Sequence, residues 1–214
     1  MKNILFLFSI LSLKSFSYIN VYPTYFDKPI DKNQGYMEYT LFNKKSIPIK
    51  YRCFLEPSGS DNNLVSWTEI YPKSIILKPK ESKVIKVLIK SPPGAEEKQY
   101  SEYLVFKEVP ANFYRTSKVN VLTQLKLKIN AYVGDLNPTI NLSRIGNNIE
   151  IKNSGKRNLN GEIFLGSKKA NGLFISKINL IPGETKLIKN TEKNGFLYFY
   201  LVNGEVLSKD LGCL

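Results

Sequence analysis

The chain has 214 residues, a formal net charge of +13, two cysteines and no histidine. This length suffices for one large domain or two of ordinary size. The lack of histidine removes the commonest general base and metal ligand, and no catalytic or nucleotide-binding motif is present, so we predict a binding protein that is not an enzyme and holds no metal or cofactor.

Residues 1–17 have the pattern of a secretory signal peptide. Lys2 forms a short basic start, Ile4–Leu13 is an apolar run, and Ser15–Ser17 offers small residues for cleavage. The run is too short to span a bilayer. We predict an exported chain without membrane insertion after cleavage, the alternative being an anchor that is never cut.

The positive charge is spread along the chain, without a block of Lys and Arg. Nucleic-acid-binding proteins usually concentrate such charge on one face, and an exported protein rarely meets nucleic acid. We therefore expect no nucleic-acid partner. A module that binds an anionic envelope polymer remains an alternative supported by net charge alone.

The apolar residues alternate along short runs that turn residues separate, and no amphipathic helix is evident. Alternation marks Met37–Leu41 and Ile85–Ile89, whereas Tyr103–Phe106 is apolar on both faces, as in a central strand. Asn203-Gly204 suits a two-residue hairpin turn in which both residues take positive φ. The pattern predicts an all-β chain of sandwiches.

A nine-residue segment occurs twice. Leu77–Ile85 (LKPKESKVI) matches Leu180–Ile188 (LIPGETKLI), with an offset that corresponds to about one sandwich domain. We predict two immunoglobulin-like domains at residues 18–135 and 136–214, with the boundary near Gly134–Pro138.

Residues 119–130 (VNVLTQLKLKIN) alternate over an unusually long run and predict one long strand. One face is polar, apart from Leu122. The other face is mostly apolar, and this face either covers the core of its own domain or contacts a partner. It carries Val119, Val121, Thr123, Leu125, Leu127 and Ile129.

The two cysteines have different settings. Cys53 shares a face with Ile49, Tyr51 and Leu55, so a buried thiol is expected. Cys213 lies one residue from the end of the sequence. The two residues either form a bridge in an oxidising compartment or remain separate thiols.

Five segments of the first domain carry a resemblance through the order in which they occur. They are Val21–Thr24 (VYPT), Thr40–Pro48 (TLFNKKSIP), Ile70–Pro72 (IYP), Leu77–Ser82 (LKPKES) and Phe106–Pro110 (FKEVP). In this order they resemble segments of the periplasmic pilus chaperones of the chaperone–usher type, although Lys80 stands where the family has a glycine. The likeness covers residues 18–135 by motif, and residues 136–214 by length and strand pattern only.

This resemblance implies a periplasmic protein that lends the strand at 119–130 to a pilus subunit whose own fold lacks a strand. The subunit would then pass to an outer-membrane usher, and no cofactor would be needed. Backbone hydrogen bonds would supply affinity and apolar side chains would fill the subunit's groove. The groove-filling candidates are Val119, Val121, Thr123, Leu125 and Leu127.

The family also anchors the subunit's terminal carboxylate with two basic residues. Lys128 is the best match for the Lys of this pair and Lys126 the second, although either can be a solvated strand residue. The matching Arg is absent, because Tyr25 follows Thr24. Tyr25 can donate only a neutral hydrogen bond, which is weaker. Arg52 on a neighbouring strand is a possible substitute.

A second function is also compatible with the sequence. A secreted structural or adhesive immunoglobulin-like protein, such as a pilus component, would use the same edge for permanent assembly. Such a subunit would be expected to lack a strand or to carry a spare N-terminal extension. Here we expect the second domain to end in its own hairpin, and little precedes Val21 after the predicted signal peptide, so the chaperone is favoured.

Overall fold

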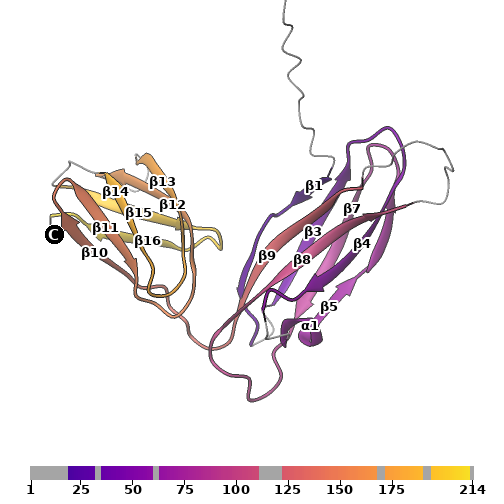
Figure 1. Cartoon of the computed structure of the whole chain (residues 1–214), viewed down its shortest axis with the longest axis horizontal. Helices are drawn as coiled ribbons and strands as arrows, with labels where there is room; N and C mark the ends of the chain where they lie inside the picture. Colours follow the sequence, from indigo (N-terminus) through magenta and orange to yellow (C-terminus); the bar gives the residue numbers. More distant parts are fainter. Residues whose placement is uncertain are drawn as a thin grey trace, which may run out of the picture.

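The computed structural model of the chain describes residues 19–31, 35–59, 63–110, 122–167, 172–189 and 194–212. The predicted signal peptide, Val119, Val121 and Cys213 lie outside these residues. The described chain forms two β-sandwiches, and Figure 1 shows them as two arms that are joined at one end.

The first sandwich consists of two sheets formed by β1 to β9. The four-stranded sheet has the order β1-β3-β7-β5, and the five-stranded sheet has the order β2-β9-β8-β4-β6. One short helix, α1 (Asn63–Trp67), precedes β5. The strands are β1 (Ile19–Tyr22), β2 (Phe26–Pro29), β3 (Tyr36–Asn43), β4 (Ile49–Glu56), β5 (Thr68–Tyr71), β6 (Ser74–Leu77), β7 (Ser82–Ile89), β8 (Gln99–Val109) and β9 (Gln124–Tyr132).

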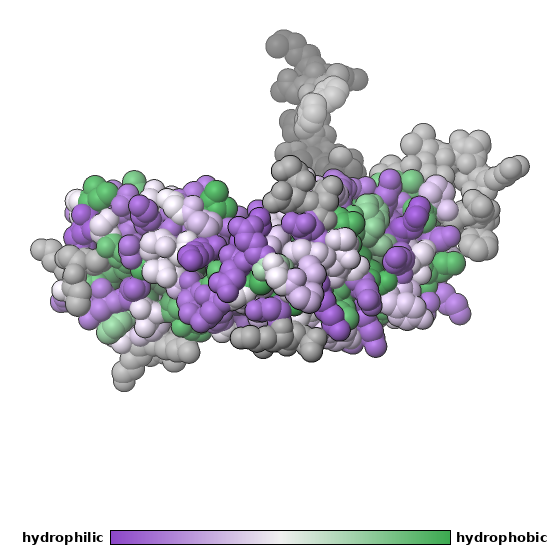
Figure 2. Space-filling model, turned by 90° about the horizontal axis from the view of Figure 1, so that it is seen from below, coloured by the Kyte–Doolittle hydropathy of each residue, from purple (hydrophilic) through white to green (hydrophobic). Residues whose placement is uncertain are grey.

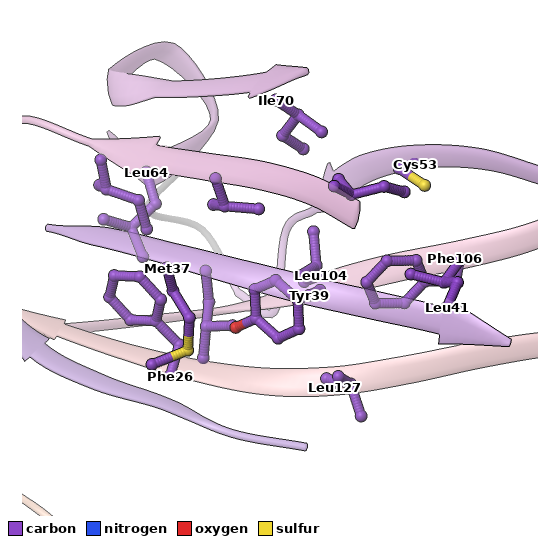
Figure 3. Close-up of a cluster of buried hydrophobic side chains, with 14 of the residues drawn as sticks. Phe26, Met37, Tyr39, Leu41, Cys53, Leu64, Ile70, Leu104, Phe106 and Leu127 are labelled. Atoms are coloured by element: carbon purple, nitrogen blue, oxygen red, sulfur yellow. The ribbon is translucent and has the colours of Figure 1, made fainter. Parts of the chain in front are cut away.

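Buried and exposed side chains alternate along the strands of the first sandwich, and the buried ones pack between its two sheets. Tyr39 on β3 and Phe106 on β8 are fully buried, and their ring centroids lie 5.8 Å apart. Figure 3 shows this core, which includes Leu127 of β9 and the free thiol of Cys53. Burial raises the pKa of Cys53 to about 12, so the thiol is protonated. The predicted burial of Cys53 is confirmed.

The second sandwich has a separate hydrophobic core and is formed by β10 to β16. Its sheets have the orders β10-β11-β14 and β13-β12-β15-β16. The two-sandwich, all-β fold predicted from the sequence is therefore confirmed. The strands are β10 (Ile140–Ile145), β11 (Asn148–Asn153), β12 (Leu159–Gly166), β13 (Leu173–Leu180), β14 (Thr185–Lys189), β15 (Phe196–Leu201) and β16 (Val206–Asp210).

The repeated segment forms the same turn in both sandwiches. Glu81 accepts a hydrogen bond from the backbone N–H of Lys78 at 2.6 Å, and Glu184 accepts one from that of Ile181 at 3.0 Å. The residue before each glutamate has positive φ, which is 62° at Lys80 and 87° at Gly183. The repeat is therefore structural, because each copy turns the chain into the next strand of its sandwich.

A buried asparagine holds this turn in each sandwich. The Asn43 amide donates to the carbonyls of Leu77 and Lys78 at 3.1 and 3.0 Å. The Asn153 amide donates to the Leu180 carbonyl at 3.0 Å and to the Arg157 carbonyl at 2.8 Å. Asn153 thereby ties the loop that carries Arg157 to the second core.

The predicted hairpin at Asn203-Gly204 is present between β15 and β16, but its predicted turn type is wrong. Of the two turn residues, Gly204 has positive φ, at 91°, and Asn203 does not. Asn203 instead accepts a hydrogen bond from the Glu205 N–H at 3.2 Å and donates one to the Glu205 carboxylate at 2.9 Å. Such side-chain-to-backbone bonding is an alternative way for Asn to turn the chain. Here it also orients Glu205.

Candidate functional site

One edge of β9 is open over part of its length. β8 pairs with β9 along Gln124–Tyr132, whereas β2 covers the opposite edge only from Ile129 onward. In the described part of the chain, residues 124–128 therefore have a strand neighbour on one side only. We call these five residues the open edge.

The backbone groups of alternate residues point out of the open edge. Thr123 accepts a hydrogen bond from the N–H of Glu108 on β8, and Tyr132 accepts one from Ile30, on the β2 side. Because the direction of backbone groups alternates along a strand, odd-numbered residues bond toward β8. The N–H and C=O groups of Gln124 and Lys126 therefore face outward, available to an added strand, as does the N–H of Lys128, whose C=O lies against Phe26 of β2.

The strand differs from its prediction in extent, since β9 begins at Gln124 and continues to Tyr132. Leu122 and Thr123 precede it outside regular structure. The prediction of a strand over 119–130 is therefore wrong at residues 122 and 123, while residues 119–121 lie outside the described structure. Thr123 instead donates its hydroxyl to Glu108 at 2.6 Å, and Glu108 pairs with Lys45 at 2.9 Å.

The apolar face of β9 enters the core gradually. Leu125 is partly buried at the margin of the first core, while Leu127 is 7% exposed and Ile129 is fully buried. In this structure Leu127 therefore covers its own core, the first of the two roles considered for this face. Leu125 lies where the apolar face leaves the core.

The candidate anchor residues have different environments. Lys126 pairs with Glu56 and lies 6.0 Å from the Tyr103 ring centroid. Lys128 is exposed, and no described residue forms an ion pair with it. Tyr25 packs partly buried against the first core. Arg52 lies on β4, two strands in from β9, in the row of Gln124 rather than in that of Lys128.

A charge cluster, buried except for Glu205, joins the two sandwiches at the end of β9. We define this junction cluster as Asp27, Tyr132, Arg157 and Glu205. Arg157, only 2% exposed, enters from the second sandwich and pairs with Glu205 of the β15–β16 turn. Its Nη1 lies 3.5 Å from Asp27 Oδ1, and its Cζ lies 4.8 Å from the Tyr132 ring centroid. Arg157 therefore connects both sandwiches electrostatically.

Burial governs the electrostatics of this cluster. Desolvation raises the pKa of Asp27 to about 6, against the opposing effect of Arg157, and nearby Glu205 raises it further. Asp27 Oδ1 and the Nε and Nη1 atoms of Arg157 have no hydrogen-bond partner among the described residues. Asp27 and Arg157 thus attract each other electrostatically, but they lack the hydrogen bonds that would fully offset the cost of removing both charges from water.

A chain of amides continues from the junction to β9. The Asn158 N–H donates to Gln99 Oε1 at 2.7 Å, and Gln99 donates to Asn130 at 3.2 Å. Asn130 is two residues from Lys128 on the same face of β9. Arg157 and Glu205 also line a hollow of about 260 Å³ between the sandwiches. Figure 2 shows hydrophilic residues gathered where the sandwiches meet.

The junction cluster was not predicted from the sequence. Arg157 is a single basic residue in a polar loop, and Asp27, Tyr132 and Glu205 come from three other segments. No spacing pattern links four residues so far apart in the chain. The one local signal was Asn203-Gly204, which marked the turn that carries Glu205.

Neither a metal site nor a membrane-spanning helix is found in the described structure. Its His, Cys, Asp and Glu residues form no cluster of three or more that could hold a metal ion. Among the described residues, no helix is long and apolar enough to cross a membrane.

The two immunoglobulin-like sandwiches define a class of two-domain β proteins, and solved structures make this class more specific. The chaperone DraB of E. coli has 10% identity and a TM-score of 0.57, over 90% of this chain and 96% of DraB. The YadV chaperone has 13% identity and a TM-score of 0.55, over 90% of this chain and 98% of YadV. A chain of the Salmonella enterica complex between the SafA pilin and the SafB chaperone has 10% identity and a TM-score of 0.54, over 90% of this chain and 95% of that chain.

The chain therefore has the fold of the pilus chaperones, and the resemblance noted in its sequence is confirmed at the level of the fold. No protein-family model and no curated protein matches the sequence. At 10–13% identity, the chain is distant in sequence from these structural neighbours.

Proposed function

We propose that this protein is a periplasmic chaperone that holds pilus subunits by adding the open edge of β9 to their incomplete fold. The observation that carries the proposal is the absence of a strand neighbour beside residues 124–128 in the described chain, within the fold that pilus chaperones share. Unpaired edges promote indiscriminate association unless a protein blocks or uses them. Strand addition would use this one.

The backbone would supply most of the affinity. The outward N–H and C=O groups of Gln124 and Lys126, with the N–H of Lys128, would continue the ladder, with about 0.5–1.5 kcal/mol per hydrogen bond. Leu125, at the margin of the core, would extend toward the subunit's groove. Val119, Val121 and Thr123 would follow it along the predicted groove-filling face, and Leu127 would mainly support the strand from within.

Lys128 is the proposed anchor for the subunit's terminal carboxylate. It is exposed and without an ion-pair partner among the described residues, whereas Lys126 already pairs with Glu56. Tyr25 would contribute at most a neutral hydrogen bond. The proposal also includes a cleaved signal peptide at residues 1–17, domains at 18–135 and 136–214, and delivery of the subunit to an outer-membrane usher.

A proline scan of the edge tests the strand-addition step. Proline at Lys126 removes an outward N–H and leaves the ladder with β8 intact, because proline is tolerated where the N–H faces away from a neighbour. The exported protein is co-expressed with candidate pilus subunits and purified. We expect Lys126→Pro to remain folded but to lose the subunit, while Lys126→Ala, which keeps the N–H, retains it.

Side-chain variants then separate the two contact types. Leu125→Glu should abolish copurification by placing a charge in the groove, and Lys128→Ala should weaken it by removing the anchor. Equal copurification of wild type, Lys126→Pro and Leu125→Glu would refute strand addition and would favour the structural alternative.

A further inference from the structure

The outer face of the five-stranded sheet is strongly basic. We define the cationic face as the outward residues of β4, β8 and β9 together with Lys73, which precedes β6. Glu56, the one carboxylate among the outward residues of β4, β6, β8 and β9, is paired with Lys126. The basic residues of this face are Lys50, Arg52, Lys73, Lys107, Lys126 and Lys128.

Two of these cations face each other without a counter-ion. Arg52 on β4 and Lys107 on β8 are direct cross-strand partners. Both are exposed, and no described carboxylate pairs with either. Like charges directly opposite each other destabilise a sheet. An anion placed between them would reverse this effect.

The same pair borders a hollow. A depression of about 430 Å³ is lined by Arg52, Lys107 and Lys73, with Ser74 beside them. Phe54, which is 37% exposed, forms an apolar wall. Three cations and an aromatic ring fit a carboxylate-bearing side chain, since the charge and the adjacent methylene groups both find complementary surfaces.

The hollow is continuous with the open edge. Gln124 on β9, Lys107 and Arg52 form one row across the sheet. At about 4.8 Å per strand, Arg52 lies roughly 10 Å from β9. A strand added at the open edge would place its outward side chains in line with this row and beside Lys126 and Lys128. A flexible segment leaving that strand would cross Lys107 to reach the hollow.

We propose that the cationic face recognises an acidic polypeptide segment of the partner that pairs with β9, with the hollow at Arg52, Lys73 and Lys107 as its principal carboxylate site. Continuity with the open edge favours a protein segment over an anionic lipid. This inference rests on the proposed function for the identity of the partner. It adds that the partner is selected by negative charge as well as by strand pairing.

The test uses hexaglutamate as an acidic probe, with hexaglutamine as its neutral counterpart. Binding to the full mature chain is followed by NMR and by titration at low and high salt. We expect hexaglutamate alone to bind, with amide shifts concentrated around Arg52, Lys73 and Lys107 and with weaker binding at high salt. The variant Arg52→Ser/Lys107→Ser should weaken binding roughly tenfold.

A charge-matched variant provides the control. Lys152→Ser/Lys209→Ser removes two exposed lysines from the second sandwich and should bind hexaglutamate as wild type does. Equal weakening in both variants, or dispersed shifts, would overturn the inference in favour of a general charge effect. Phosphatidylglycerol vesicles that bind through Arg52 and Lys107 when hexaglutamate does not would overturn it in favour of a lipid.

Failure of this inference can be told apart from failure of the proposed function. Lys126→Pro should lose a pilus subunit and still bind hexaglutamate, because the hollow lies on other strands. If wild type copurifies with a pilus subunit but does not bind hexaglutamate, the acidic-segment site is refuted and strand addition still stands.

Discussion

Arg157 and Asp27 lie 3.5 Å apart, Nη1 to Oδ1, across the boundary between the two sandwiches. Both are nearly inaccessible to solvent, and in the described part of the chain neither of these two atoms has a hydrogen-bond partner. The contact places a charge from the second sandwich against β2, the strand that covers β9 next to the open edge. The junction is thus coupled to the strand proposed to bind the partner.

Removing Arg157 should destabilise the protein strongly at neutral pH. Arg157→Met leaves the Asp27 carboxylate buried without its cation, and breaking a buried pair in this way costs about 3–5 kcal/mol. Denaturant unfolding measures the loss. The double variant Arg157→Met/Asp27→Asn should recover much of it, since no unpaired buried carboxylate remains at Asp27. Unchanged stability in Arg157→Met would show that the pair has no structural role.

The pH dependence of stability should contain a component from Asp27. Burial raises the pKa of Asp27 from its ordinary 3.8 to about 6, so the folded state holds the proton more tightly. The stabilising contribution is complete below pH 4 and is lost as pH rises through 6, by about 3 kcal/mol for a shift of this size.

The measurement compares unfolding free energies of wild type and Asp27→Asn between pH 4 and 7. The difference, wild type minus variant, should fall with rising pH over this interval. A difference that stays flat, or one that rises, would place the folded pKa of Asp27 at or below its ordinary value.

Glycine at position 80 should stabilise the first sandwich. Lys80 has φ of 62°, a conformation that costs non-glycine residues about 1–2 kcal/mol, and the matching Gly183 avoids that cost. Glycine's greater freedom in the unfolded chain offsets part of the gain, which leaves up to about 1 kcal/mol for Lys80→Gly. Thermal and denaturant unfolding should both report the increase.

The matched control is Gly183→Ala in the second sandwich. A β-carbon at Gly183 would meet no atom within 4 Å, so any loss of stability would come from the backbone conformation alone. We expect a loss of about 1–2 kcal/mol. Opposite signs at the two positions would support the equivalence of the turns, whereas equal signs would contradict it.

The two buried asparagines should be among the most sensitive polar residues of the fold. Asn43→Ala and Asn153→Ala each leave buried carbonyls without a donor, at about 1–3 kcal/mol per unsatisfied group. Exposed Asn141→Ala on β10 serves as the control and should change stability by less than about 0.5 kcal/mol. Comparable losses of stability in all three variants would show that the two buried asparagines have no special role in holding the turns.

The sequence determined those features that depend on neighbours in the chain. The alternation of Met37, Tyr39 and Leu41 predicts a strand with one buried face, and all three residues are buried on β3. The repeat at Leu77–Ile85 and Leu180–Ile188 likewise predicted the same local structure in both halves. Side-chain periodicity and turn chemistry act over a few residues, so a single sequence expresses them directly.

Only the tertiary structure decided which part of β9 is covered. Leu125 and Leu127 are equivalent in the alternating pattern, yet one lies at the margin of the core and the other inside it. The difference arises because strands from distant parts of the sequence determine where the core ends along β9. One of them, β2, pairs with β9 only from Ile129. Arg157 meets Asp27 and Glu205 for the same reason, since contacts between remote segments are set by how the sandwiches pack and leave no periodic trace in the sequence.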